Sequence, residues 1–132
     1  MLAHPRGVQA VIPTLRVADS ERSKRFYVDG MGFQVDWEWR HEPGFPVFLQ
    51  VSRPGMRLYL SEHEGDCPAG ALVHLYVKDV DAWQAELLTR GILAEHQPVD
   101  RPWGNREMLV RDPDGNKLCI CTVLSEASEP ER

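Results

Sequence analysis

Four side chains in the second half of the sequence could take part in acid–base or metal chemistry. His74 could be a metal ligand, a proton acceptor or a hydrogen-bond partner for a ligand, and we favour a polar pocket residue without a chemical task. Glu107, next to Arg106, could act as an acid or a base, and we favour structural pairing with an arginine. Cys119 and Cys121 could bind a soft metal or be oxidised. Because no helix N-terminus or basic cluster is evident to lower their pKa, we favour a passive role.

The other sequence patterns that could carry chemistry are weaker. Glu62-His63-Glu64 resembles a metal cluster in one dimension, but it lies at the end of a strand and runs into Gly65-Asp66, so we predict a solvated loop. The sequence contains no Ser-His-Asp order, no phosphate-binding loop and no HExxH motif. Nucleophilic hydrolysis and zinc-protease chemistry therefore have no support.

Aromatic side chains are the positive evidence for a binding site. Trp37 and Trp39 alternate with acidic residues on one predicted strand, and we expect the two rings to share a face with Phe33 and Val35. Trp39 lies at the end of the strand and is the better candidate to reach a cleft. The alternative is that Trp37 or Trp39 is a core or dimer contact.

Three more rings complete the candidate site. Trp103 lies in a Pro-Gly loop where full burial is difficult, and alternation places Tyr59 and Tyr76 on the uncovered face of a sheet. Flat rings bind planar ligands, and carboxylates nearby favour cationic ones. Asp36 and Glu38 should point away from the tryptophans, which weakens the cationic preference. The expected ligand-binding residues are Trp39, Tyr59, His74, Tyr76, Trp103 and Glu107.

The elements that must position these residues occur twice, at an offset of 60 positions in the sequence. Leu15-Arg16-Val17-Ala18-Asp19 matches Leu75-Tyr76-Val77-Lys78-Asp79, and Ser52-Arg53-Pro54-Gly55 falls on the turn Asp112-Pro113-Asp114-Gly115. Each half begins with a strand, at 10–17 and 71–77, that ends before an N-capping Asp19 or Asp79 and a helix. Three strands follow in each half, at 33–39, 46–51 and 56–61, and at 92–98, 106–111 and 117–123. The pattern predicts an α+β fold of two tandem βαβββ modules.

Alternation within the strands assigns their faces. Val73, Leu75 and Val77 form an apolar row, as do the pairs Leu58 and Leu60, and Leu118 and Ile120. We expect the helices to cover these rows. The opposite rows should then line an uncovered, concave sheet surface where ligands bind.

The two βαβββ units and several motifs resemble the vicinal oxygen chelate superfamily. The matching stretches are Ile12 to Asp19, Arg25-Phe26-Tyr27, Met31-Gly32-Phe33 and Pro102-Trp103-Gly104 running to Asn116. The resemblance covers residues 8–123. Members of this superfamily include glyoxalase I, extradiol dioxygenases, fosfomycin-resistance enzymes and bleomycin-resistance proteins. The start of the chain and Pro102-Trp103-Gly104 favour the bleomycin-resistance branch.

Enzymes of this superfamily hold a divalent metal at four positions, which the resemblance maps onto Ile12, Tyr59, Leu72 and Cys119. Isoleucine and leucine offer no lone pair, tyrosine is a poor ligand for most divalent ions, and one cysteine cannot hold a metal alone. The sequence therefore departs from the enzymes and agrees with bleomycin-resistance proteins, which bind their ligand without a metal of their own. We expect no cofactor and lean against an enzyme.

Composition and charge agree with this hypothesis. The net charge of −5 argues against nucleic acid as a partner, and no apolar run approaches a membrane span or a signal peptide, so we expect a cytoplasmic protein. Residues 8–123 should form one domain of two repeats, 8–62 and 70–123, with a disordered tail at 124–132. The resemblance implies a homodimer with clefts at the interface, and the sequence leaves open whether the N-terminal strand is exchanged between subunits.

The expected function is metal-free sequestration of a small aromatic, cationic molecule. The alternative is a glyoxalase-like lyase, isomerase or transferase with a rearranged metal site or with His74 and Glu107 as catalytic groups.

Overall fold

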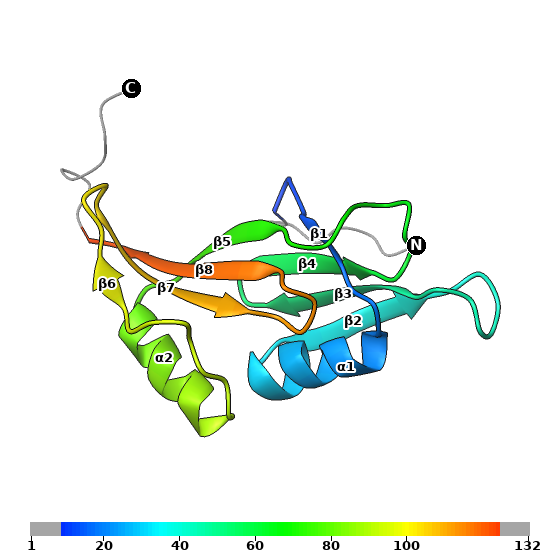
Figure 1. Ribbon diagram of the computed structural model, residues 1–132, viewed down its shortest axis with the longest axis horizontal. Coiled ribbons are helices and arrows are strands. Elements are labelled where there is room, and N and C mark those ends of the chain that lie inside the picture. The colour runs from blue at the N-terminus through cyan, green and yellow to red at the C-terminus, as the bar shows by residue number, and fades with distance from the viewer. Residues whose placement is uncertain (1–8, 125–132) are drawn as a thin grey trace.

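The structure is a computed structural model that describes residues 9–124, and it contains two helices and two four-stranded sheets (Figure 1). Most of the expected tail, residues 125–132, lies outside the described residues. The first half contains β1 (Thr14–Arg16), α1 (Ser20–Lys24) continued by a π-helical segment (Arg25–Gly30), β2 (Gln34–Trp39), β3 (Phe48–Arg53) and β4 (Met56–Ser61). The second half contains β5 (Leu72–Tyr76), α2 (Val80–Thr89), β6 (Val99–Asp100), β7 (Asn105–Arg111) and β8 (Lys117–Val123). The predicted α+β fold of two βαβββ modules is confirmed.

Both sheets have the same topology. Their strand orders are β1-β4-β3-β2 and β5-β8-β7-β6. The first strand of each sheet pairs in parallel with the last, and the other pairs are antiparallel. The helix between the first and second strands lets the chain return to the same sheet.

Aspartates begin both helices, as predicted. The Asp19 carboxylate accepts hydrogen bonds from the backbone N–H groups of Glu21 and Arg22, at 3.0 and 3.3 Å. The Asp79 carboxylate accepts from the N–H of Ala82 at 3.1 Å. These bonds satisfy amides that have no partner within the first turn of a helix.

Two predicted strands differ from the structure. No strand forms over 92–98. The edge strand of the second sheet is instead the two-residue β6 at Val99–Asp100. Pro98 has no N–H to donate to a ladder, and the N–H of Glu95 makes a single bond to the carbonyl of Leu109 at 2.8 Å. The first strand is regular only over Thr14–Arg16 rather than 10–17, because Pro13 also donates no backbone hydrogen bond.

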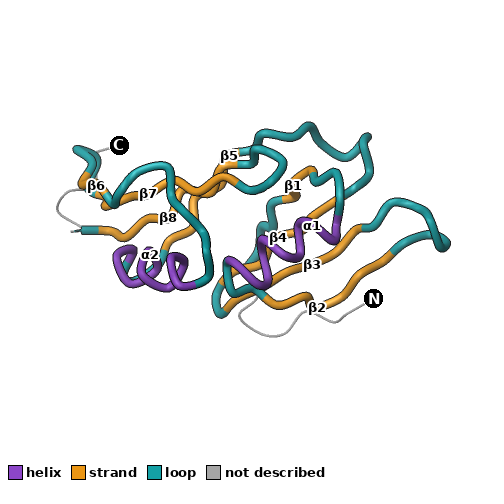
Figure 2. Tube along the Cα trace, turned by 60° about the horizontal axis from the view of Figure 1, so that its bottom comes forward, coloured by secondary structure: helices purple, strands orange, loops and turns teal. Residues whose placement is uncertain are grey.

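Alternation predicted the core correctly. Leu58, Leu60, Leu118 and Ile120 are at most 1% exposed, and Leu75 is 5% exposed. One core cluster joins residues of both halves. Figures 1 and 2 show both helices along the same side of the sheets. The other side, which we call the open face, carries no helix among residues 9–124.

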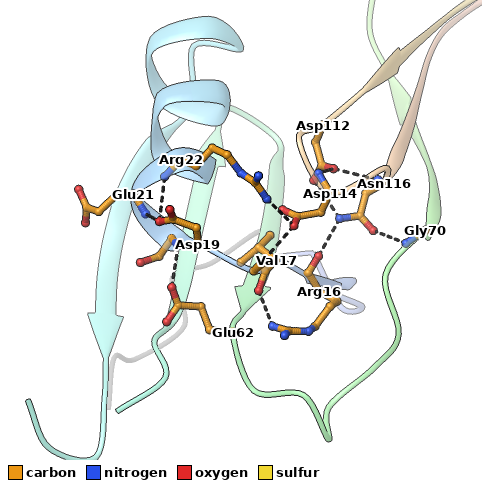
Figure 3. A network of polar contacts seen from close by, with 12 residues as sticks. Arg16, Val17, Asp19, Glu21, Arg22, Glu62, Gly70, Asp112, Asp114 and Asn116 are labelled. Carbon is orange, nitrogen blue, oxygen red and sulfur yellow. Dashed lines mark hydrogen bonds and ion pairs between the residues drawn. The ribbon is translucent and has the colours of Figure 1, made fainter. Parts of the chain in front are cut away.

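The predicted turn at 112–116 connects the halves (Figure 3). The Asn116 amide donates to the carbonyl of Arg16 and to the carboxylate of Asp112, at 2.9 Å each, and its oxygen accepts from the N–H groups of Gly70 and Ala71 at 3.1 and 3.0 Å. Nearby, Arg22 pairs with Asp114 at 2.8 Å. The turn therefore holds the first strand of each half in place.

Among the described residues, no helix is long and apolar enough to span a membrane.

Candidate functional site

Glu107 is the centre of a hydrogen-bonded cluster on the open face of the second sheet. Its Oε2 atom accepts from Trp103 Nε1 at 2.9 Å and from Asn105 Nδ2 at 3.1 Å, and Asn105 Nδ2 also donates to the hydroxyl of Tyr76 at 3.1 Å. The guanidinium of Arg101 lies 3.7 Å from Oε1. The structure therefore brings together three of the predicted site residues, with Asn105 as a connector that the sequence analysis missed.

The arginine partner of Glu107 is Arg101, not its neighbour in sequence. Arg106 pairs instead with Asp81 and Asp100, at 2.8 Å each. Adjacent residues of a strand point to opposite faces, so Arg106 and Glu107 cannot meet. Burial alone would raise the pKa of Glu107, but the hydrogen bonds from Trp103 and Asn105 outweigh it and lower that pKa. Glu107 is therefore an ionised carboxylate at neutral pH.

Cys119 and Cys121 lie beside Glu107 as buried thiols. Their sulfur atoms are 3.6 Å apart, and Cys121 Sγ lies 3.7 Å from Glu107 Oε2. Burial raises the pKa of both thiols, and the negative charge of Glu107 adds to the rise. Both cysteines are therefore protonated at neutral pH.

His74, together with Glu107 and Cys119, forms a group that could be considered as a metal-binding site. Ligand atoms of His74, Glu107 and Cys119 all lie within 4.8 Å of one another. Metal–ligand bonds of about 2.0–2.3 Å would place tetrahedral zinc ligands roughly 3.5 Å apart. In addition, Glu107 already accepts two N–H bonds and the thiol must lose a proton to bind a metal. The donor set fits a hydrogen-bonded network better than a metal centre.

Residues at the four family metal positions are not arranged as a ligand set. Ile12 is half-buried, and Leu72 is an exposed apolar side chain. Tyr59 packs against aromatic rings, and Cys119 belongs to the Glu107 cluster. Ile12 and Leu72 thus offer no ligand atom, and Tyr59 and Cys119 contact other side chains.

Aromatic rings gather on the open face of the first sheet. Trp37 stacks on Phe48 with ring centroids 5.9 Å apart and planes at 24°, and both contact Tyr59, at 5.8 and 5.0 Å. All three side chains are half-buried. We call Trp37, Phe48 and Tyr59 the aromatic triad. Trp39 lies farther along β2, 53% exposed, with its ring 5.8 Å from His41.

The predicted faces of the tryptophans were wrong because of a β-bulge. Phe33 and Val35 pack on the core, but the pairing of β2 with β3 shifts between Val35 and Trp37. The extra residue, Asp36, moves Trp37 onto the open face, opposite Gln50. The sequence carries no marker of the bulge, and alternation alone therefore favours Trp39 over Trp37 as the ring that reaches a cleft.

The same bulge places Asp36 on the open face, contrary to prediction. Its carboxylate accepts from Gln50 Nε2 at 2.8 Å, Ser52 Oγ at 3.0 Å and Gln34 Nε2 at 3.1 Å. Burial alone would raise the pKa of Asp36, but these hydrogen bonds outweigh it and lower that pKa. Glu38 behaves as predicted and turns to the other side, where it pairs with Lys24 of α1.

Glu62 is not the solvated residue that was expected. It accepts from the backbone N–H groups of Ser20, at 2.6 Å, and Val47, at 2.8 Å. It therefore joins the start of α1 to the segment before β3, which is a structural role.

A groove of about 320 Å³ lies between the N-terminal segment and the second sheet. Its lining includes Val11 and Pro13, Arg57 of β4, and His74 and Tyr76 of β5. Neither the aromatic triad nor Trp103 contributes to it. Through Tyr76, whose hydroxyl accepts from Asn105, the groove borders the Glu107 cluster.

The fold and the site together define a class of protein: a paired βαβββ binding domain whose open face carries aromatic rings and ionised carboxylates. Residues 4–126 match the family model described as glyoxalase superfamily protein, and the chain belongs to that family.

Curated relatives and solved structures extend this result. A bleomycin resistance protein of Geobacillus stearothermophilus is 31% identical over 124 residues, which cover 81% of this chain and 91% of the relative. The crystal structure of TnmS3, an antibiotic binding protein from Streptomyces sp. CB03234, is 31% identical with a TM-score of 0.71, covering 90% of this chain and 99% of that one. A bleomycin-binding protein complexed with bleomycin has a TM-score of 0.70 at 21% identity, covering 87% and 98%, and shows the fold alone.

Proposed function

We propose that this protein binds a small aromatic, cationic molecule of the antibiotic class and sequesters it without a metal ion. The observation that carries the proposal is the aromatic triad, three half-buried rings that meet on the open face, over which residues 9–124 place no helix. A planar ligand gains both stacking and apolar burial on such a surface. Two relatives of about 31% identity are named for bleomycin resistance and antibiotic binding, which supports the same ligand class.

The ligand contacts would come from both sheets. Tyr59, with the rest of the aromatic triad, and the exposed Trp39 form the wall in the first sheet. His74, Tyr76, Trp103 and Glu107 form the polar and aromatic part in the second sheet, where Trp103 is 49% and Tyr76 is 55% exposed. A multi-ring ligand would contact both parts, and the groove of about 320 Å³ beside His74 and Tyr76 would take one of its substituents.

The chemistry of the possible metal ligands supports metal-free binding. Ile12 and Leu72 cannot donate an electron pair, and the Cys119 thiol is held protonated beside an ionised carboxylate. Binding of a metal to the native state alone would raise the melting temperature by several degrees. We expect a chelator to leave the melting temperature unchanged, and a clear fall would contradict metal-free binding.

We further propose that the protein acts in the cytoplasm as a homodimer. Large apolar side chains remain exposed on the open face of the second sheet, including Leu72 at 54% and Tyr76 at 55%. A second copy of the chain would cover such surface and turn an open sheet into a closed cleft. Sedimentation at micromolar concentration should give the mass of a dimer, and a monomer would contradict this part of the proposal.

The decisive experiment is calorimetric titration of the protein with bleomycin, together with elemental analysis and native mass spectrometry of the untreated protein. We expect saturable binding, no stoichiometric metal and a loss of affinity in Trp37→Ala. A wild-type protein that binds neither bleomycin nor any related drug would overturn sequestration.

One observation favours a second candidate, a glyoxalase-like lyase, isomerase or transferase. His74, Glu107 and Cys119 lie close enough that a modest contraction could bring them onto one metal. Tightly held stoichiometric metal that is lost in His74→Ala would favour this enzyme over the binding protein.

A further inference from the structure

Asp36 and Trp37 are consecutive residues that both project onto the open face. Regular alternation would place them on opposite sides, and the bulge in β2 removes that alternation. The position of the carboxylate is fixed by its bonds to Gln50 and Ser52, the residues of β3 that alternate with the core residues Leu49 and Val51. An anionic group therefore lies at the border of the aromatic triad.

In the part of the chain that the structure describes, the hydrogen bonds to this carboxylate come from neutral donors. Its three hydrogen bonds come from two amides and one hydroxyl, so they fix its orientation without cancelling its charge. Within residues 9–124, no lysine, arginine or histidine nitrogen lies within ion-pair distance of Asp36. Arg57 is the cation whose charge acts on it, and it pairs in register with Ser52 on the same face.

The other carboxylate of β2 is already neutralised. Glu38 faces α1 and forms an ion pair with Lys24. The two acidic residues of this strand therefore differ in a way that matters for a ligand. Among the described residues Asp36 has no ion-pair partner and lies beside aromatic rings, whereas Glu38 is paired with Lys24.

Resting on the proposed function, we propose that Asp36 is the specificity-determining residue that makes this site select aromatic ligands carrying a cationic group next to a planar ring. A ring stacked on Trp37 would hold an attached amine or amidine close to the carboxylate. The same cation would also lie against the faces of the neighbouring rings, which attract positive charge. Because the carboxylate is oriented before binding, little entropy is lost in forming the new ion pair.

The lowered pKa of Asp36 keeps this charge in place at and below neutral pH. The preference for cationic ligands therefore does not depend on protonation of Asp36 near neutral pH.

Two planar probes of similar shape test the proposal by calorimetry at neutral pH: 9-aminoacridine, which is cationic, and acridine, which is neutral. We expect wild-type protein to prefer the cationic probe by roughly twofold to fivefold, the range expected for a partly exposed charge pair. Asp36→Asn should abolish this preference and leave the affinity for acridine unchanged. The matched control Glu38→Gln removes the same charge from the same strand on the other face, and it should retain the preference.

A second variant should increase the preference for the cationic probe. It tests the proposal even if Asp36→Asn does not fold. Arg57→Gln removes the nearby cation and should increase the preference for 9-aminoacridine about twofold to threefold. A preference that survives Asp36→Asn, or that is unchanged in Arg57→Gln, overturns the role of Asp36 while aromatic binding stands. If wild-type protein binds neither probe nor bleomycin, both this inference and the proposed function fail.

Discussion

At the scale of single residues, Trp103 is placed so that its substitution should affect ligand binding more than stability. Its indole N–H donates to Glu107, yet the ring is 49% exposed and lies outside the core cluster. Glu107 keeps its bond from Asn105 when the ring is removed. The ring is therefore placed to contact a ligand rather than to support the fold.

We predict that Trp103→Ala weakens binding of a bleomycin-like ligand by roughly tenfold or more, because a stacked ring contributes about 1–3 kcal/mol. The melting temperature should change little. Trp103→Phe retains a stacking ring but no donor, so its loss of affinity should be smaller. Calorimetric titration and thermal melts of the three proteins check this. Normal binding by an alanine variant that melts several degrees lower would instead assign Trp103 to the fold.

At the scale of elements, Glu62 links α1 to β3 through charge. It accepts from the N–H groups of Ser20 and Val47, and although burial alone would raise the pKa of Glu62, these bonds lower it. A carboxylate whose pKa is lower in the folded state stabilises the protein above its unfolded pKa of about 4.3. That contribution is lost as the pH falls through the lower, folded pKa.

Glu62→Gln should therefore reduce the free energy of unfolding at neutral pH by about 1–2 kcal/mol. The difference from wild type should shrink as the pH falls below about 4. Urea denaturation at several pH values measures it, with the exposed Glu64→Gln as control. A deficit that stays constant down to acid pH would mean that the charge of Glu62 has no part in it.

The turn between β7 and β8 provides the second prediction at this scale. Asn116 is 0% exposed, and both its amide donor and its oxygen are bonded to backbone or to Asp112. Asn116→Ala leaves buried polar groups of both modules without partners. We expect a loss of about 2–4 kcal/mol in the free energy of unfolding, measured by urea denaturation. A loss below about 0.5 kcal/mol would show that solvent replaces these bonds.

At the scale of the whole molecule, we propose that the repeats 8–62 and 70–123 form a single domain. Tyr27, Met31 and Phe33 of the first half belong to the same core cluster as Leu87 and Met108 of the second. Neither half would bury these side chains alone. We predict one cooperative transition in which tryptophan fluorescence and far-ultraviolet circular dichroism coincide. Two separate transitions would show that the modules fold independently.

The sequence by itself determined the repeated βαβββ plan, the helix starts at Asp19 and Asp79, and the core rows of β4, β5 and β8. These features depend on local geometry: a strand alternates its side chains every two residues, and a capping carboxylate bonds within its own turn. The same local rule assigned Tyr59, His74 and Tyr76 to the open face.

Only the tertiary structure decided which side chains meet. The bulge at Asp36 is a property of the pairing between β2 and β3, so β2 alone could not reveal that Trp37 and Asp36 share a face. Likewise, Arg101 lies in the segment between β6 and β7, and only the folded chain brings its guanidinium to 3.7 Å from Glu107 Oε1. Register and loop path are set by contacts between distant segments, and the pattern of a single strand carries no record of them.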